Sequence, residues 1–461
     1  MFRVKNPEQK SIQLPTPNRD GSSSIDGRYS SHFFQLESGL KLSIVSFPGI
    51  STISLRCFVF VGSAYESTHN SGISHFLEHM LFRGNKKLGD AARLNVEMEK
   101  LGGELNAATS FDLTEYWYDF HKDYLKEGIE KFCHLIQYPL FEQIEVERSI
   151  ILEEIKGDYN DDNRLIDLDS LSSELLWPGH PMSFPIIGNS QTIGKIKRSN
   201  LISWHEKYYC PSNIVLGITG DFETSEVVNQ IDHLFQAGKV KTAPRRYRRI
   251  KSSPAGGSQL KLVFDRDNQF GFQWCFPSYH LTHELRIEYE LIQRILDDGN
   301  SSRLQKLIRE EKGLVYDISA ETMFFEAGVT FSIQSVVGTN RLRELVSTLT
   351  DLIRNLASEG ITLEELDLAK LRYRANLECA GDSAQGVLYN KLMPVLYPCG
   401  STYEEIIPRL KAISVEKINA ILGQLLGQNM TTFAIVGPCD QKTDEMLEAK
   451  LYPWINGRKS L

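Results

Sequence analysis

The stretch His75-Phe76-Leu77-Glu78-His79 decides how this chain of 461 residues is interpreted. Positions three and four apart on a helix lie on the same face, because each residue turns the helix by about 100°. A helix through this stretch therefore places two imidazoles and one carboxylate side by side. The two histidines can bind one metal ion, and Glu78 is then free to act on a water molecule at the metal.

The residues around this stretch predict a helix that packs through its opposite face. Its apolar stripe consists of Ile73, Phe76, Leu77 and Met80. Ser71 or Ser74 is expected to cap the start of this helix, and Gly84 suits its end. A pair of buried structural histidines is the alternative to a metal site. Because core histidines would lie within the apolar stripe, the pattern favours the metal site.

A metal ion with two histidine ligands needs a third protein ligand, because catalytic zinc usually has three protein ligands and a water. Residues 142–157 predict a second helix, whose expected apolar stripe is Ile144, Ile150, Ile151 and Ile155. Glu147 and Glu154 fall within this stripe. A buried carboxylate is costly unless it is paired, hydrogen-bonded or metal-bound. We therefore expect Glu154 to be the third ligand and Glu147 to support the site, with a pair of structural salt bridges as the alternative.

Taken together, these two segments resemble the inverzincin metallopeptidases, the group that includes pitrilysin, insulin-degrading enzyme and the mitochondrial processing peptidases. The order H-x-x-E-H is one of their motifs. The run Glu147-Arg-Ser-Ile-Ile-Leu-Glu-Glu154 is similar to their second motif. The resemblance, which is greatest to the short two-domain members, implies Zn²⁺ on His75, His79 and Glu154. It also implies Glu78 as general base and a supporting role for Glu147.

The same resemblance assigns two further groups of residues. The family's active-site edge strand, which pairs with an extended substrate peptide, corresponds to Asn106, Ala107, Ala108 and Thr109. Arg309 and Tyr316 resemble a C-terminal pair that orients the substrate and helps to polarise its carbonyl group. Without the resemblance, Arg309 is equally well explained as a charge at a helix end, and Tyr316 as a packed aromatic residue.

Length and composition limit the class of protein. The chain is long enough for two domains, and 41% hydrophobic residues suffice for two cores. A formal net charge of -8 argues against a nucleic-acid-binding protein. The 7 cysteines are dispersed and no C-x-x-C occurs, so the sequence indicates neither a disulfide framework nor a second zinc site. Reduced thiols fit a cytoplasmic location.

The sequence divides into two halves that look like diverged copies. Residues 236–257 are basic and contain Pro and Gly, which is typical of a linker. A nucleic-acid-binding patch is the alternative for this segment. The expected domains are a zinc-bearing domain over residues 30–235 and a second domain over 258–461, after a disordered lead-in over 1–29. The N-terminus lacks an apolar signal segment, and no run of about 18 apolar residues exists that would span a membrane.

Two pairs of segments support the duplication. Asn213–Gly220 is echoed by Met430–Gly437, and both predict a buried strand that ends in glycine. Leu81–Asn85 likewise corresponds to Leu296–Asn300. The second pairing aligns the two histidines and the glutamate of the metal motif with Glu290, Gln293 and Arg294. The second half is therefore expected to hold no metal and to contribute substrate contacts.

Each half mixes predicted strands with amphipathic helices. The strand patterns include Leu40–Phe47, Ile53–Val61 and Leu105–Phe120. Since strands and helices do not alternate strictly, the expected class is α+β, with an antiparallel-rich mixed sheet backed by helices in each half. The fold implied by the resemblance is of the same kind.

The resemblance implies a zinc-dependent endopeptidase that cuts peptides or leader-like and presequence-like segments. In the family four such domains enclose a chamber, and this chain supplies two. We therefore expect it to form a homodimer, or a heterodimer with a sister chain of the same fold. The main alternative is a non-catalytic partner or structural subunit of a peptidase-like heterodimer, since some family members have lost the metal. We expect neither a nucleic-acid nor a membrane partner.

Overall fold

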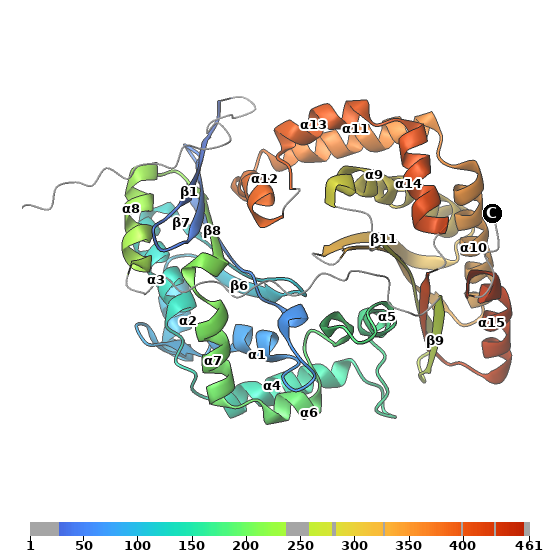
Figure 1. Ribbon diagram of the computed structural model, residues 1–461, viewed down its shortest axis with the longest axis horizontal. Coiled ribbons are helices and arrows are strands. Elements are labelled where there is room, and N and C mark those ends of the chain that lie inside the picture. The colour runs from blue at the N-terminus through green and yellow to red at the C-terminus, as the bar shows by residue number, and fades with distance from the viewer. Residues whose placement is uncertain are drawn as a thin grey trace, which may run out of the picture.

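The computed structural model describes residues 27–236, 258–278, 283–325, 328–397, 400–427 and 430–455. The lead-in expected over 1–29 and the linker expected over 236–257 lie almost entirely outside these residues. Each half of the chain builds one sheet covered by helices (Figure 1), which confirms the predicted α+β class with two repeated units. Among the described residues, no helix combines the length and the apolar character that a bilayer crossing requires.

The first half contains a mixed sheet in which one strand pair is parallel. Its strands are β1 (Ser30–Gln35), β2 (Lys41–Ser46), β3 (Thr52–Val59), β6 (Glu104–Thr109), β7 (Thr114–His121) and β8 (Ile214–Gly220), with a short separate pair β4 (Gly84–Asn85) and β5 (Gly89–Asp90). The six strands of the main sheet are ordered β1-β2-β8-β3-β7-β6, and only β2 and β8 pair in parallel among them. Strand β6 therefore forms one edge of the sheet.

The strand predicted over Leu105–Phe120 is wrong in one respect, because the structure forms a hairpin of β6 and β7 there. The turn is closed by Ser110, whose N–H and hydroxyl both donate to the carbonyl oxygen of Leu113 at 2.9 Å. Serine and aspartate favour such turns, since their short side chains bond to the local backbone. The alternating pattern of β7 continued across the turn and concealed it.

The helices of the first half lie mainly on one face of its sheet. They are α1 (Ile73–Leu81), α2 (Ala91–Glu99), α3 (Leu125–Gln137), α4 (Ile144–Gly157), α5 (Leu168–Leu176), α6 (Ser190–Lys195), α7 (Arg198–Tyr208) and α8 (Thr224–Phe235). The core between sheet and helices includes Leu55 and Ile218 from the sheet and Phe76 and Phe132 from the helices. This packing fixes α1, which carries the histidine motif, against the sheet.

The second half repeats the architecture. Its strands are β9 (Gln259–Phe264), β10 (Gln269–Ser278), β11 (Val315–Phe325), β12 (Gly328–Gly338) and β13 (Thr432–Gly437). Its helices are α9 (Arg286–Leu296), α10 (Leu342–Glu359), α11 (Leu363–Ala380), α12 (Ala384–Leu396), α13 (Tyr403–Ala412), α14 (Val415–Gly427) and α15 (Gln441–Ile455). A π-helical segment, Gln305–Glu311, precedes β11.

The strand order shows the duplication directly. The order β2-β8-β3-β7-β6 of the first sheet corresponds to β9-β13-β10-β12-β11 of the second. In both sheets the one parallel pair is equivalent, β2 with β8 and β9 with β13. The segments matched in the sequence, Asn213–Gly220 and Met430–Gly437, contain β8 and β13, and both strands are buried throughout.

Each half also lends one helix to the sheet of the other half. Helix α12 covers the outer face of the first sheet, where Leu388 and Leu392 pack in one cluster with Val45, Phe58 and Val215. Helix α5 packs in turn on the second sheet, against β10 and β13. Figure 1 shows α12 beside β8 and α5 below the second sheet. The two halves are thus locked together by an exchange of helices.

Candidate metal centre

Helix α1 presents the motif as the sequence predicts, but its start is capped differently. The predicted stripe of Ile73, Phe76, Leu77 and Met80 is buried, with at most 2% exposure. The prediction that Ser71 or Ser74 caps the helix is wrong. The N-cap is Gly72 at φ 88°, where a Cβ atom would lie 2.5 Å from a backbone oxygen, so that only glycine fits.

A glutamate from outside the helix takes the capping role. Glu66 accepts hydrogen bonds from the backbone N–H of Gly72 at 2.6 Å and of Ser74 at 2.8 Å. It is 4% exposed, and burial raises its pKa to about 8, against the lowering effect of these N–H donors. Sequence reasoning missed Glu66, because an isolated glutamate in an irregular segment gives no periodic signal. Its position fixes the start of the helix that carries both histidines.

Helix α4 is rotated relative to the prediction. Its buried residues are Glu147, Ile151 and Ile155. Ile150 is 43% exposed and the Glu154 side chain 49% exposed, so the prediction that both lie in the buried stripe is wrong. Each precedes a buried isoleucine by one position, which turns it by about 100° around the helix axis. That rotation brings the Glu154 carboxylate to the open side, beside the two histidines.

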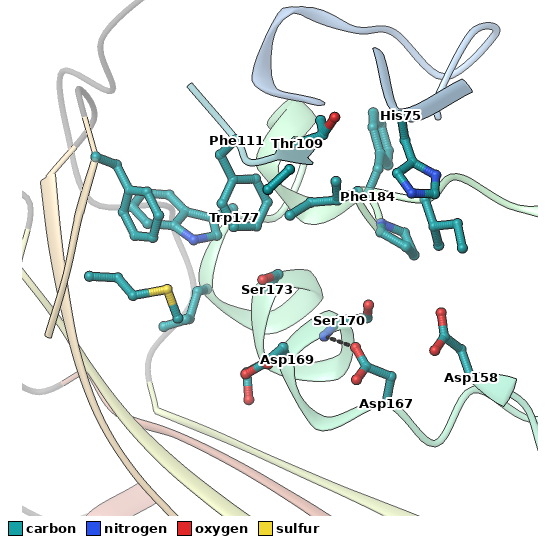
Figure 2. A pocket seen from close by; sticks show the side chains of 18 of the residues that line it. His75, Thr109, Phe111, Asp158, Asp167, Asp169, Ser170, Ser173, Trp177 and Phe184 are labelled. Atoms are coloured by element: carbon teal, nitrogen blue, oxygen red, sulfur yellow. Dashed lines mark hydrogen bonds between the residues drawn. The ribbon is translucent and has the colours of Figure 1, made fainter. Parts of the chain in front are cut away.

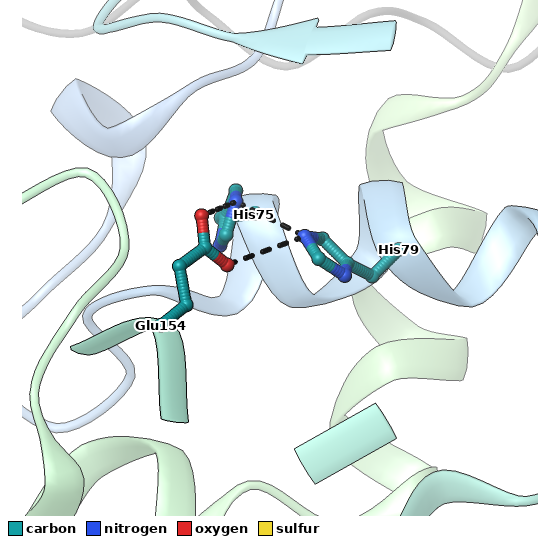
Figure 3. Close-up of side chains that lie close together, drawn as sticks. All are labelled: His75, His79 and Glu154. Carbon is teal, nitrogen blue, oxygen red and sulfur yellow. Dashed lines mark hydrogen bonds and ion pairs between the residues drawn. The ribbon is translucent and has the colours of Figure 1, made fainter. Parts of the chain in front are cut away.

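The two histidines and Glu154 converge on one point (Figure 3), with one donor atom of each lying within 4.8 Å of the others. The Nε2 atoms of His75 and His79 are 3.2 Å apart. The carboxylate of Glu154 places Oε1 3.9 Å from Nε2 of His75, and Oε2 3.8 Å from Nε2 of His79. Zinc bonds of about 2.0–2.2 Å in a tetrahedron separate ligand atoms by about 3.3–3.6 Å. The donor set therefore fits a tetrahedral metal ion with one open position.

Glu147 contacts the His79 ring on the side away from the metal donors. Its Oε1 lies 2.7 Å from Nδ1 of His79, while the Arg83 Nε–H donates to its Oε2. Burial raises the pKa of Glu147, but the bonds from His79 and Arg83 outweigh it and leave that pKa lowered. An ionised carboxylate at Nδ1 keeps the proton there and leaves Nε2 as the metal donor. Arg83 was not foreseen from the sequence, although it follows His79 by one helical turn.

His75 is suited to bind a cation because its imidazole is neutral. Burial and the neighbouring His79 lower the pKa of His75 to about 3, against an opposing effect of Glu147. For His79, burial lowers the pKa, but the hydrogen bond and charge of Glu147 outweigh it and the net pKa is raised.

Glu78 lies next to this donor set and contacts the edge strand. It is 8% exposed, and burial raises its pKa although a hydrogen bond from Thr109 opposes the change. The Thr109 hydroxyl donates to Glu78 Oε2 at 2.6 Å. Within the part of the chain that the structure describes, strand β6, which carries residues 106–109, pairs only with β7, so its other edge can accept an extended chain.

A cavity of about 610 Å³ lies in front of the metal donors and is lined by both halves of the chain. Figure 2 shows two chemically distinct walls: carboxylates of Asp158, Asp167 and Asp169 on one side and the aromatic rings of Phe111, Trp177 and Phe184 on the other. The second sheet contributes Gln273, Thr330 and Ser332. Many of the cavity residues that sequence reasoning missed come from α5 and from the second sheet.

A second cavity of about 410 Å³ opens on the other side of α1's motif. It is lined by Arg83, Asn95 and Asn106, and it shares Glu78, His79 and Ala107 with the larger cavity. The predicted edge-strand residues are therefore distributed along both cavities: Asn106 borders the smaller one, while Ala108 and Thr109 border the larger one. Of the metal donors, His79 borders both cavities, whereas His75 and Glu154 border only the larger one.

Arg309 and Tyr316 lie apart from this centre. The Arg309 guanidinium is 6.0 Å from the centre of the Tyr316 ring, so the two are neighbours. Tyr316 is 90% exposed, and neither residue lines either cavity. The structure brings the pair together but does not place it at the metal donors of the same chain, and its substrate-orienting role stays a prediction.

The equivalent place in the second half contains ion pairs. Glu290 accepts from Arg286 at 2.9 Å and from the Tyr373 hydroxyl. Arg294 donates to Asp298 at 2.7 Å. Among the described residues, His75, His79 and Glu154 form the only group of three side chains whose donor atoms gather closely enough for a metal. Helix α9 thus carries ion pairs at the positions that the sequence alignment matches with the metal motif.

Comparison with known proteins agrees with this asymmetry. The family model "Insulinase (Peptidase family M16)" matches residues 44–180, which contain the metal donors. The model "Peptidase M16 inactive domain" matches residues 195–373, which contain the counterpart without them.

Relatives and solved structures cover most of the chain. A Bacillus subtilis protein named an uncharacterized zinc protease is 24% identical over 88% of this chain and 98% of its own length. A Rickettsia bellii protein of the same description is 27% identical over 88% of this chain and 97% of its own. The fold matches a protease from Helicobacter pylori with a TM-score of 0.80 at 21% identity, over 89% of this chain and 100% of the other. With its two halves matched by two models of one family, the chain belongs to peptidase family M16.

Proposed function

We propose that the chain is a zinc-dependent endopeptidase, with Zn²⁺ held by His75, His79 and Glu154. The observation that carries this proposal is the spacing of 3.2–3.9 Å among two imidazole nitrogens and the carboxylate oxygens, with Glu78 beside them. The names of the relatives as zinc proteases support it. A role as a non-catalytic subunit gives no reason for four such side chains to converge at one cavity.

In the proposed mechanism the chain supplies the proton transfers and the positioning. When bound, zinc supplies a Lewis acid that polarises the scissile carbonyl and makes a water molecule more acidic. Glu78 takes a proton from the attacking water at its carboxylate and returns that proton to the leaving amine. Because burial raises the pKa of Glu78, this carboxylate is a better proton acceptor than an exposed glutamate. Glu147 holds His79 in the tautomer that has Nε2 free.

The proposed substrate is an extended peptide that adds to the free edge of β6. Main-chain hydrogen bonds to residues 106–109 give affinity without regard to sequence, while the two cavities accept side chains on either side of the metal. The acidic and aromatic walls of the larger cavity favour basic and bulky apolar side chains. Leader-like and presequence-like peptides have this character.

We also propose that two chains of this fold pair, either as a homodimer or with a sister chain. The exposed position of Arg309 and Tyr316 outside both cavities supports pairing, because such residues can then reach a partner's site. Sedimentation of the active species tests this. An active monomer would contradict it.

The decisive experiment on the reaction compares the wild-type protein with Glu78→Gln. Wild type should bind one zinc per chain and cleave members of a peptide library. Glu78→Gln should bind zinc equally and cleave none, since it keeps the metal donors and lacks the base. A wild-type protein that holds zinc but cuts no peptide, alone or with a co-encoded sister chain, would establish the non-catalytic alternative.

A further inference from the structure

One hydrogen bond joins the edge strand to the base. Thr109 Oγ1 donates to Glu78 Oε2 at 2.6 Å. Among the described residues, no other donor bonds to the Glu78 carboxylate, so this hydroxyl alone fixes its orientation through a hydrogen bond. The short distance is typical of an O–H donor on an ionised carboxylate.

The sequence of β6 places that hydroxyl on the correct face. Ala107 and Thr109 are two positions apart, so their side chains lie on the same side of the strand. Both line the larger cavity, together with Glu78. Alanine at 107 leaves space beside the base, whereas threonine at 109 supplies the single polar contact.

We propose that Thr109 is a positioning residue for the general base, and that it couples the strand that binds substrate to the group that moves the proton. The proposal rests on the peptidase function proposed above. A peptide added to the free edge of β6 lies about 4.8 Å from that strand. The backbone of β6 then sets the place of the scissile carbonyl, and the Thr109 side chain sets the place of the base relative to the same backbone.

This arrangement separates binding from turnover. The backbone of β6 binds the peptide, and the Thr109 hydroxyl takes no part in that pairing. Removal of the hydroxyl therefore leaves the affinity for peptide and for zinc in place. It frees the Glu78 carboxylate to rotate away from the position at which it accepts a proton.

Thr109→Val tests the idea, because valine has the shape of threonine, favours strands and lacks the hydroxyl. With zinc-loaded full-length protein and one cleaved library peptide, we expect kcat to fall about 10- to 100-fold. KM and the zinc content should stay within twofold of wild type. Thr109→Ser keeps a hydroxyl donor and should restore most of the kcat that Thr109→Val loses.

Thr114→Val is the matched control. Thr114 is the register partner of Thr109 in β7, but its hydroxyl donates to the carbonyl oxygen of Val61, away from the base. Loss of this hydroxyl should lower the melting temperature and leave kcat within twofold. An equal loss of kcat in both valine variants would show that distortion of the hairpin is the cause, and would overturn the inference.

The outcomes distinguish this inference from the proposed function. If the zinc-loaded wild type cleaves nothing, the peptidase function fails and this inference fails with it. If wild type cleaves and Thr109→Val has an unchanged kcat, or loses zinc, or changes only KM, the peptidase function stands and the positioning role is wrong.

Discussion

Oε1 of Glu147 lies 2.7 Å from Nδ1 of His79, on the side of the ring away from the metal donors. Glu147 is 4% exposed, and its other oxygen is held by Arg83. The carboxylate thus has both oxygens engaged and orients the ring without entering the metal site. The His79 ring thus lies between the metal donors on one side and the Glu147 carboxylate on the other.

Glu147→Gln should weaken metal binding. The neutral amide removes the charge that holds the His79 proton on Nδ1, and Arg83 is left without its partner. We expect the affinity for zinc to fall about 10- to 100-fold, measured by competition with a chromophoric chelator. Glu78→Gln, which leaves Glu147 and the donors unchanged, serves as the control. Equal affinities in wild type and Glu147→Gln would contradict the assigned role.

Removal of the metal should destabilise the protein as well as inactivate it. Because the donors come from α1 and α4, a bound ion links two helices. A ligand present at about 100 times its Kd stabilises the folded state by about 2.7 kcal/mol. Chelator-treated wild type should therefore melt at a lower temperature than the zinc-loaded protein, and added zinc should reverse the shift. Glu154→Ala should show little response to zinc, and a full response would exclude Glu154 as a ligand.

Glu66 should make stability depend on pH between 4.5 and 8. Its folded-state pKa is raised from 4.5 to about 8, so the folded protein retains a proton that the unfolded chain releases. The contribution is greatest below pH 4.5 and is lost as the pH rises toward 8, by an amount on the order of 5 kcal/mol. Glu66→Gln lacks this titration. Urea denaturation of metal-free wild type and metal-free Glu66→Gln should show that the difference between their free energies of unfolding changes between pH 4.5 and 8. A difference that stays constant over this range would refute the assignment.

Leu388→Ala should test the exchange of helices. Leu388 in α12 is fully buried against the first sheet, so the substitution should lower the free energy of unfolding by about 2–5 kcal/mol. Leu371→Ala is the matched control, because Leu371 is 64% exposed on α11, and it should change stability by less than about 0.5 kcal/mol. Similar changes in the free energy of unfolding for the two variants would mean that the packing of α12 on the first sheet does not stabilise the fold.

The local part of the site could be predicted from the sequence. The spacing of His75, Glu78 and His79 fixes their common face, because helical geometry alone determines it. The stripe on α1 was correct for the same reason. On α4 the choice of Glu154 as third ligand rested on its expected burial and on the resemblance, but the expected burial of Ile150 and Glu154 was wrong. Periodicity gives the angles between side chains, whereas the direction of the buried face depends on the neighbouring elements.

The long-range part could not be predicted. Glu66 caps α1 through two hydrogen bonds that depend on the path of an irregular segment. Thr109 was expected to line the substrate, but its bond to Glu78 follows from the register of β6 beside α1. The positions of α5 and α12 on the opposite sheets follow from tertiary packing, which no local pattern encodes. In the acidic wall of the larger cavity, Asp167 and Asp169 come with α5 and Asp158 follows α4.

The exchange of α5 and α12 has a consequence for synthesis on the ribosome. The first sheet is complete once β8 has been made, yet α12 follows only at residues 384–396. At about 5–20 residues per second, about 10–30 s separate the two events. During that interval Val45, Phe58 and Val215 form an apolar face that α12 does not yet cover. The nascent chain therefore spends a defined period as an aggregation-prone intermediate, which ends only when translation of the second half is nearly finished.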